Sequence, residues 1–400
     1  MPLTRAALLA VALTSVAAPP RSPAPAVAGV RADSADAALD RAVDALVRPL
    51  ASSGRFAGVV LVAQGGRVRV ERAYGMASVE LGVPNTPATR FRLFSITKQF
   101  TAAAVLQLVA RGQVDLDAPV RTYLPQLPAA WQGATVHQLL THTSGIPNLD
   151  NAWGDSLEAH GAARLLDNLA RVAPALARVP LAEAPGTKAR YNNFGYELLA
   201  CVVERASGRP FAEYLQAEVF RLAGMTGAGT DARAEVGGGV YVGSAVVPGL
   251  ASGYNGAPGR LQVAAPKEFE QPGAGSVYAT ARDLWRYDEA LTRGVVLPPA
   301  VERLRVARAV PVGPRAAYGY GWIVTRPGGV ADTTPGAPYF VHHSGGTNGY
   351  LGEYARYPRE GACVVVLMNR GDDGFADPAA IRAGIAALLF GPRYPAPRAR

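Results

Sequence analysis

A serine and a lysine three residues apart are the side chains of this sequence with the clearest potential for chemistry. The pair lies in the segment Phe94-Ser95-Ile96-Thr97-Lys98, at the start of an apolar run that predicts a helix ending at Gly112. One helical turn separates the two, so the Lys98 amine can reach the Ser95 hydroxyl. A lysine partly removed from water has a lowered pKa and can accept the serine proton. The spacing therefore predicts a serine nucleophile with a lysine base.

The scarcity of lysine supports this interpretation. Only three of the 40 basic residues are lysines, namely Lys98, Lys188 and Lys267, so an ordinary surface cation in this chain is an arginine. Arginine does not lose its proton in proteins and cannot act as the base. The alternative is a serine that caps a helix and a lysine that points into solvent. The rarity of lysine argues against that alternative.

A second candidate motif is Tyr191-Asn192-Asn193, which precedes a helical run from Gly195 to Ser207. A phenol near a cation can relay a proton. A neighbouring carboxamide can hold a substrate carbonyl and the lysine. The pattern is weak by itself, and the alternative is a buried tyrosine beside a turn-forming asparagine.

A third candidate motif, His343-Ser344-Gly345-Gly346, ends an apolar strand-like run. Glycines in a strand allow another backbone or a ligand to approach closely. A backbone N–H of this stretch, at Gly346, could form an oxyanion hole with the N–H of Ser95. The alternative is a β-turn with a histidine whose hydrogen bonds are satisfied.

Together the three motifs resemble those of the serine β-lactamase and penicillin-binding-protein superfamily, on its class C β-lactamase, D-alanyl-D-alanine carboxypeptidase and esterase side. The segments 139–147, 273–280 and 364–369 are also similar to the family, so the resemblance covers about residues 36–392. It implies a two-lobed α/β fold, in which an antiparallel sheet is flanked by N- and C-terminal helices and carries a mostly helical inserted lobe. It also implies an acyl-enzyme mechanism without a metal or an organic cofactor.

The resemblance assigns roles to individual residues. Ser95 is the nucleophile, Lys98 and Tyr191 transfer protons, and the N–H groups of Ser95 and Gly346 form the oxyanion hole. The expected partner is a small molecule or peptide with an ester or amide bond. The residues implied to contact it are Asn193, His343, Ser344 and Gly345.

The third motif departs from the class C β-lactamases, in which it usually begins with lysine. A mostly neutral imidazole at His343 binds a carboxylate less strongly than an ammonium. We therefore expect activity on esters first, on D-amino-acid peptides second and on β-lactams third. A class C-like β-lactamase is one alternative, and a catalytically silent penicillin-binding or regulatory protein is another.

The chain predicts an exported protein with one catalytic domain. Residues 1–28 are typical of a signal peptide, with Arg5 before an apolar stretch and small residues after it, which implies a periplasmic or extracellular location. Residues 29–392 form the domain, with an α/β lobe at about 36–94 and 275–392 and an α lobe at about 95–274. A basic tail covers 393–400. Strands are expected at 56–62, 67–74, 318–325, 339–343, 352–357 and 363–368, between helices at 36–50 and 376–389.

Composition excludes several other classes. The net charge of +9 is scattered and accompanies no nucleic-acid-binding motif, and no second stretch is long and apolar enough to span a membrane. There is no Gly-x-Ser-x-Gly motif of an α/β-hydrolase and no metal-binding spacing of histidines. Cys201 and Cys363 lie in apolar runs and are expected to be buried small side chains, although a disulfide between them stays open. The sequence does not indicate the oligomeric state.

Overall fold

The computed structural model describes residues 34–160, 164–230, 233–236, 239–244, 246–264, 271–332, 334, 336–347, 349–371 and 374–394. The predicted signal peptide and most of the basic tail lie outside these residues. None of the helices in the described ranges is long and apolar enough to cross a membrane.

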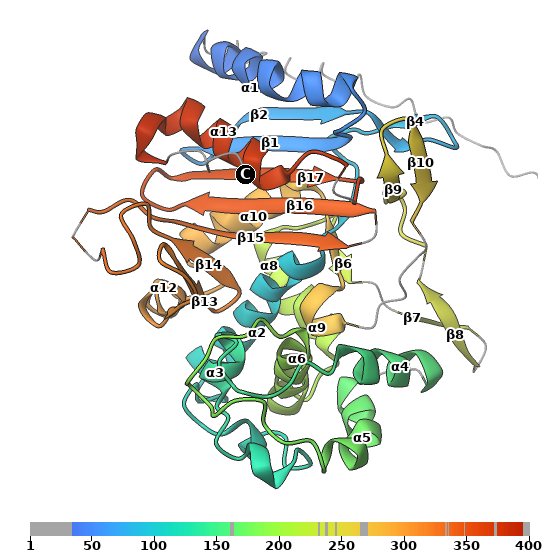
Figure 1. Cartoon of the computed structure of the whole chain (residues 1–400), viewed down its shortest axis with the longest axis vertical. Helices are drawn as coiled ribbons and strands as arrows, with labels where there is room; N and C mark the ends of the chain where they lie inside the picture. Colours follow the sequence, from blue (N-terminus) through green and yellow to red (C-terminus); the bar gives the residue numbers. More distant parts are fainter. Residues whose placement is uncertain are drawn as a thin grey trace, which may run out of the picture.

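An eight-stranded sheet forms the centre of the α/β part (Figure 1). Every neighbouring pair of its strands is antiparallel, and the N-terminal strand β1 lies beside the C-terminal strand β17. This arrangement confirms the expected fold class. The strands in spatial order are β12 (Val310–Pro311), β13 (Ala316–Gly319), β14 (Trp322–Thr325), β15 (Phe340–Thr347), β16 (Tyr350–Tyr357), β17 (Ala362–Met368), β1 (Gly58–Gln64) and β2 (Arg67–Tyr74).

Helices cover both faces of the sheet, and this explains why its central strands are apolar throughout. Strand β1 sends Val59 and Leu61 into one hydrophobic core and Val60 and Val62 into another, as the two-residue period of a strand requires. Helices α1 (Ser34–Ser52) and α13 (Pro378–Phe390) pack on one face, and α10 (Ala281–Thr292) packs on the other (Figure 1).

The middle of the chain is mostly helical and packs below the sheet in the view of Figure 1. Helix α2 (Lys98–Ala110) runs through it and is buried over most of its length. Its neighbour α6 (Asn193–Ser207) ends at Gly208 in the left-handed conformation, which is a common helix stop. The other elements of this part are η1 (Phe94–Thr97), η2 (Val120–Thr122), η3 (Ala129–Trp131), α3 (Val136–Leu140), α4 (Asp150–His160), α5 (Leu165–Leu176), α7 (Phe211–Tyr214), η4 (Leu215–Phe220), α8 (Arg221–Ala223) and α9 (Pro272–Gly275).

Short strands connect the helical part to the sheet. A three-stranded sheet pairs β11 (Val277–Ala279) with β5 (Phe91–Arg92) and β6 (Gly229–Thr230), which places α9 next to η1. The remaining strands pair as hairpins, β3 (Met76–Ser78) with β4 (Val83–Pro84), β7 (Arg233–Val236) with β8 (Gly239–Ser244), and β9 (Tyr254–Ala257) with β10 (Arg260–Val263).

One predicted strand is wrong: residues 318–325 form a hairpin and not a single strand. Tyr320 and Gly321 both have positive φ and make the turn between β13 and β14. A Cβ atom at Gly321 would lie 2.7 Å from the carbonyl oxygen of Lys98, so this turn packs directly on the start of α2. The expectation for the cysteines is confirmed, because Cys201 and Cys363 are buried and unbonded.

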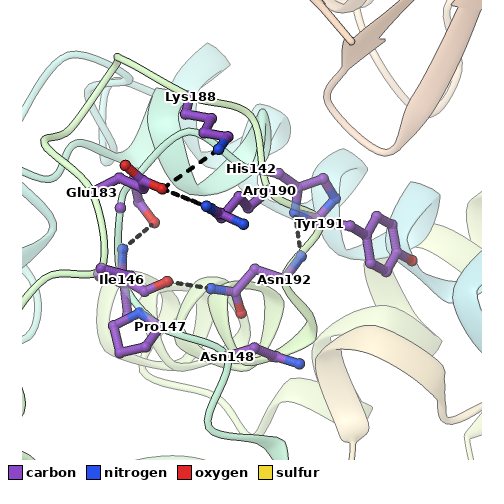
Figure 2. Close-up of a pocket in the computed structure, with 12 residues that line it drawn as sticks. His142, Ile146, Pro147, Asn148, Glu183, Lys188, Arg190, Tyr191 and Asn192 are labelled. Atoms are coloured by element: carbon purple, nitrogen blue, oxygen red, sulfur yellow. Dashed lines mark hydrogen bonds and ion pairs between the residues drawn. The ribbon is translucent and has the colours of Figure 1, made fainter. Parts of the chain in front are cut away.

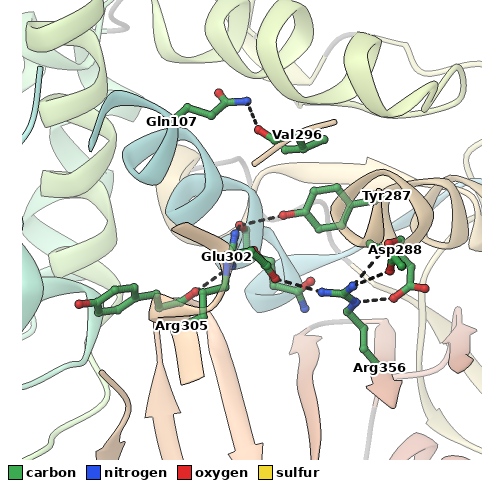
Figure 3. Close-up of polar contacts among 10 residues, drawn as sticks. Gln107, Tyr287, Asp288, Val296, Glu302, Arg305 and Arg356 are labelled. Atoms are coloured by element: carbon green, nitrogen blue, oxygen red, sulfur yellow. Dashed lines mark hydrogen bonds and ion pairs between the residues drawn. The ribbon is translucent and has the colours of Figure 1, made fainter. Parts of the chain in front are cut away.

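A buried ion network ties the short helices α11 (Pro299–Glu302) and α12 (Leu304–Ala307) to the sheet (Figure 3). Arg356 of β16 pairs with Asp288 of α10 and with Glu302 of α11. Arg305 donates a hydrogen bond to the carbonyl of Tyr320 at 2.9 Å, next to the hairpin turn that supports α2. The network therefore helps to hold the β13–β14 turn, which packs against the first residue of α2.

Candidate active site

The backbone turns sharply between the end of β5 and Ser95. Phe94 has a φ of +45°, a region that costs a non-glycine residue about 1–3 kcal/mol. Ser95 is the second residue of η1, where the N–H groups have no acceptor within the helix. Strand β11 holds this turn, because Val277 donates its N–H to Thr97 Oγ1 at 3.0 Å and accepts the N–H of Leu93 at 2.8 Å. The strained turn is thus braced on both sides of the serine.

Lys98 is fully buried, and its amine contacts three oxygen atoms. Nζ lies 3.1 Å from Ser95 Oγ, 2.8 Å from Asn193 Oδ1 and 3.2 Å from the carbonyl oxygen of Ala274. Burial lowers the pKa of Lys98 from 10.5 to about 7, although the charges of Glu197 and Asp150 act in the opposite direction. A substantial share of Lys98 is therefore neutral near neutral pH.

The three contacts match the hydrogen inventory of a neutral amine. Such an amine has two N–H donors and one lone pair. Asn193 Oδ1 and the Ala274 carbonyl can only accept, so they take the two hydrogens. The lone pair is then left for the third partner, the hydroxyl of Ser95. The geometry thus presents Lys98 as a proton acceptor for the serine.

Tyr191 lies over the amine and contacts the serine. Its ring centroid is 4.7 Å from Lys98 Nζ, and a hydrogen bond joins its hydroxyl to Ser95. Half of its surface is exposed, but its hydroxyl faces the enclosed centre of the site, and this burial raises the pKa of the phenol. The hydrogen bond with Ser95 lowers that pKa in part. Tyr191 therefore carries its proton at neutral pH and is ready to donate it.

His142 anchors the loop that carries Tyr191. Its Nδ1 accepts the N–H of Asn192 at 3.2 Å, and its ring lies 4.5 Å from the Tyr191 ring. Asn192 also donates from Nδ2 to the carbonyl of Ile146 at 2.6 Å. Burial lowers the pKa of His142 well below its ordinary value, so the ring is neutral. His142 also has a φ of +60°, a left-handed conformation that is uncommon for a residue other than glycine.

A pocket of about 520 Å³ lies between the loops 142–148 and 182–192 (Figure 2). Glu183 occupies its wall and pairs with Arg190 at 2.6 Å and with Lys188 at 3.8 Å. Tyr191 is at its edge, with the ring extending away from these charged groups (Figure 2). Tyr191 thus belongs both to this pocket and to the surroundings of Lys98, whereas Ser95 is not among the described residues that line the pocket.

His343 is buried and uncharged, and both of its ring nitrogens have partners. Nδ1 lies 2.6 Å from the carbonyl oxygen of Ser344, which can only accept, so Nδ1 carries the hydrogen. Nε2 then accepts from the hydroxyl of Tyr318 at 3.0 Å. Burial and the charge of Lys98 lower the pKa of His343 to about 3. The ring therefore offers a substrate neither a positive charge nor a free N–H.

The glycine of the third motif is required by a close backbone approach. A Cβ atom at Gly345 would lie 2.0 Å from the carbonyl oxygen of Leu93, so β15 runs directly against the turn that precedes Ser95. Gly346 is exposed one residue later. The oxyanion hole formed by the N–H groups of Ser95 and Gly346 stays a prediction.

Ser344 points to the opposite face of the sheet from His343. Its hydroxyl donates to Glu353 Oε2 at 2.7 Å, and Glu353 also pairs with His342 and Arg382. The Ser344 hydroxyl is thus occupied by its hydrogen bond to Glu353, so we expect Ser344 to contact a substrate through its backbone.

The structure brings most of the predicted residues together. Lys98 Nζ contacts Ser95 and Asn193, Tyr191 lies over this amine and interacts with Ser95, and the ring of His343 lies 6.2 Å from that of Tyr191. Sequence reasoning did not find the Ala274 carbonyl or Tyr318, because neither a main-chain oxygen nor a tyrosine in a strand carries a distinctive pattern. In the described ranges no three His, Cys, Asp or Glu side chains gather as a metal site would need.

Comparisons with known proteins show the family to which this chain belongs. The sequence profile described as Beta-lactamase matches residues 43–388. A penicillin-binding protein of Bacillus subtilis (strain 168) is 27% identical over 368 residues, which cover 88% of this chain and 76% of that protein. Esterase EstB of Burkholderia gladioli is 39% identical over 208 residues, about half of each protein. The crystal structure of a penicillin-binding protein from Bacillus halodurans superposes with a TM-score of 0.68 at 26% identity, over 87% of this chain and 98% of that one. The chain therefore belongs to the Beta-lactamase family of hydrolases.

Proposed function

We propose that the protein is a serine hydrolase that cleaves small neutral esters through an acyl-enzyme on Ser95. The contacts of Lys98 carry this proposal, because the buried amine has two acceptors for its hydrogens and Ser95 Oγ at 3.1 Å for its lone pair. The similarity to an esterase and to penicillin-binding proteins supports the same reaction class.

In the acylation step Lys98 takes the proton of Ser95 while Oγ attacks the ester carbonyl. The N–H groups of Ser95 and Gly346 stabilise the oxyanion, an effect worth about 3 kcal/mol per donor. As the carbon–oxygen bond of the ester breaks, Tyr191 gives its proton to the departing alkoxide, and Lys98 returns a proton to the phenolate. In deacylation a water molecule loses its proton to the same pair and attacks the acyl carbon, and Ser95 regains its hydrogen.

The third motif favours substrates without a carboxylate. Peptides ending in D-alanine and β-lactams both present a carboxylate near the scissile bond, and His343 has neither charge nor free donor to bind it. A neutral ester needs no such partner. We therefore keep the order ester, D-amino-acid peptide and β-lactam, with a class C-like β-lactamase as the alternative.

A substrate panel tests this proposal. p-Nitrophenyl acetate, p-nitrophenyl butyrate, nitrocefin and a D-alanyl-D-alanine peptide are each offered to the wild type and to Ser95→Ala. Hydrolysis of the acetate and butyrate with the highest kcat/KM, abolished in Ser95→Ala, is the expected result. Preferred turnover of nitrocefin would support the alternative. A protein that forms a covalent adduct with a penicillin but turns over none of the four would be the silent penicillin-binding protein.

We also propose that the protein is exported, because residues 1–28 are predicted to be a signal peptide. N-terminal sequencing of protein recovered outside the cytoplasm of an expressing bacterium tests it. Removal of this segment is expected, and an intact N-terminus in a cytoplasmic fraction would contradict it.

A further inference from the structure

We propose that Asp150 and Glu197 are positioning residues that orient Lys98 towards Ser95. Neither carboxylate touches the nucleophile. Each holds one of the two oxygen acceptors that take the hydrogens of the lysine amine. The inference rests on the proposed function only in that Lys98 must serve as the base.

Asp150 fixes which end of the Asn193 amide faces the lysine. Asn193 donates from Nδ2 to Asp150 Oδ2 at 2.9 Å, while its Oδ1 lies 2.8 Å from Lys98 Nζ. A carboxylate only accepts hydrogen bonds, so it keeps the NH₂ end of the amide on its own side. A reversed amide would place N–H donors against the amine and leave one of its hydrogens without an acceptor. Asn148 donates to the same Asp150 oxygen at 2.9 Å and holds the carboxylate in place.

Glu197 fixes the second acceptor through the backbone of α9. It is fully buried on α6, and its two oxygens accept the N–H groups of Gly273 at 3.1 Å and Ala274 at 2.9 Å. Residue 274 is thereby placed with its carbonyl oxygen 3.2 Å from Lys98 Nζ. Burial raises the pKa of the Glu197 carboxyl to about 8, while the two N–H groups that its oxygens accept act in the opposite direction and favour the ionised form.

The two carboxylates are also the charges that act on Lys98 from its surroundings. They raise its pKa against the effect of burial. From the loops and from β15, His142 and His343 face the amine as neutral rings, since burial lowers the pKa of both. Among the residues that the structure describes, the other titratable groups around it are tyrosines with raised pKa values, whose hydroxyls stay protonated: Tyr191, Tyr196 and Tyr318. Removing the negative charge of Asp150 should therefore ease the loss of the Lys98 proton, and replacing either carboxylate by an amide should disturb the orientation of the amine.

The variants Asp150→Asn and Glu197→Gln test this inference, since both keep the shape of the side chain and replace one accepting oxygen by an NH₂ group that donates. We expect kcat for p-nitrophenyl acetate to fall by about tenfold or more, because small misplacements of a catalytic group are costly. KM should change less than about twofold. In Asp150→Asn the acid limb of the kcat/KM profile should also move to lower pH by roughly half a unit, because a negative charge near Lys98 is removed.

Two matched controls separate positioning from loss of stability. Glu204→Gln alters another buried carboxylate of α6, which accepts the backbone N–H groups of Leu166 and Phe211 and lies away from Lys98. Asp155→Asn alters an exposed aspartate of α4. Glu204→Gln should lower the unfolding temperature without moving the acid limb, and Asp155→Asn should change neither.

Unchanged kcat in folded Asp150→Asn and Glu197→Gln, with an unchanged acid limb in Asp150→Asn, would overturn the inference. If Glu197→Gln does not fold, Glu197→Asp keeps a carboxylate at a shorter reach, and it should lower kcat. A Glu197→Asp enzyme with wild-type kcat would count against the role of Glu197. Failure of the proposed function itself is distinguishable, because the wild type would then show no acid limb attributable to Lys98.

Discussion

Acidification should switch off ester hydrolysis through the protonation of Lys98. The amine must be neutral to accept the proton of Ser95. At its ordinary pKa of 10.5 only about one lysine in 3,000 would be neutral at pH 7, whereas at about 7 about half are. Burial of Lys98 therefore increases the population of the reactive form about a thousandfold.

The expected profile of kcat/KM follows from that value. Because raising the pH removes the proton, activity should rise with pH, reach half of its maximum near pH 7 and level off by about pH 8. Each unit below pH 7 should cost about tenfold, so the rate at pH 5 should be about 100-fold below the plateau. His343, with a pKa of about 3, stays neutral over this range, whereas Glu197, whose pKa burial raises to about 8, ionises near its upper end.

The assay is the initial rate with p-nitrophenyl acetate at constant ionic strength, corrected for spontaneous hydrolysis. Circular dichroism at each pH confirms that the protein stays folded. A flat profile between pH 8 and pH 5.5, or an acid limb centred below about pH 5, would refute Lys98 as the proton acceptor.

Three further predictions concern stability and proton transfer. Lys98→Met should be inactive but more stable than the wild type at pH 6 by on the order of 1–3 kcal/mol, because it removes a buried amine. The pKa of Lys98 is lower in the folded protein than in the unfolded chain, so the stability advantage of Lys98→Met should shrink as the pH rises towards 10.5. Calorimetry at pH 6 and pH 10 measures this advantage, and an equal advantage at both pH values would contradict the reasoning. Gly345→Ala should lose about 3 kcal/mol of unfolding free energy or more in urea titrations, because its Cβ would lie 2.0 Å from a carbonyl oxygen, whereas Gly313→Ala, with open space around it, should not. Tyr191→Phe should slow hydrolysis of alkyl esters by about 100-fold and of p-nitrophenyl esters by much less, since the latter leave without a proton; a uniform loss would exclude the tyrosine as the acid.

Local spacing was sufficient to predict the core of the site. The three-residue interval between Ser95 and Lys98 places both on one helical turn in any helix. Gly345 could be assigned to a close approach because a glycine in a strand has few other reasons to occur there. These inferences needed no knowledge of the tertiary structure.

Contacts between distant segments could not be predicted in this way. Asp150 meets Asn193 across 43 residues, and Glu197 meets Ala274 across 77. The signal for Glu197 was a charged residue among the apolar residues of α6, and Glu204 on the same helix carries the same signal, so the sequence could not single out Glu197. The hairpin within 318–325 was also missed, because the turn is formed by a tyrosine and one glycine inside an otherwise apolar run.

The most direct test of the proposed mechanism is the mass of the protein after reaction with a fluorophosphonate. We predict one adduct per chain, located on the peptide that contains Ser95 and absent from Ser95→Ala. Labelling of the wild type at another residue, or a folded wild type that forms no adduct, would contradict the assignment of Ser95 as the nucleophile.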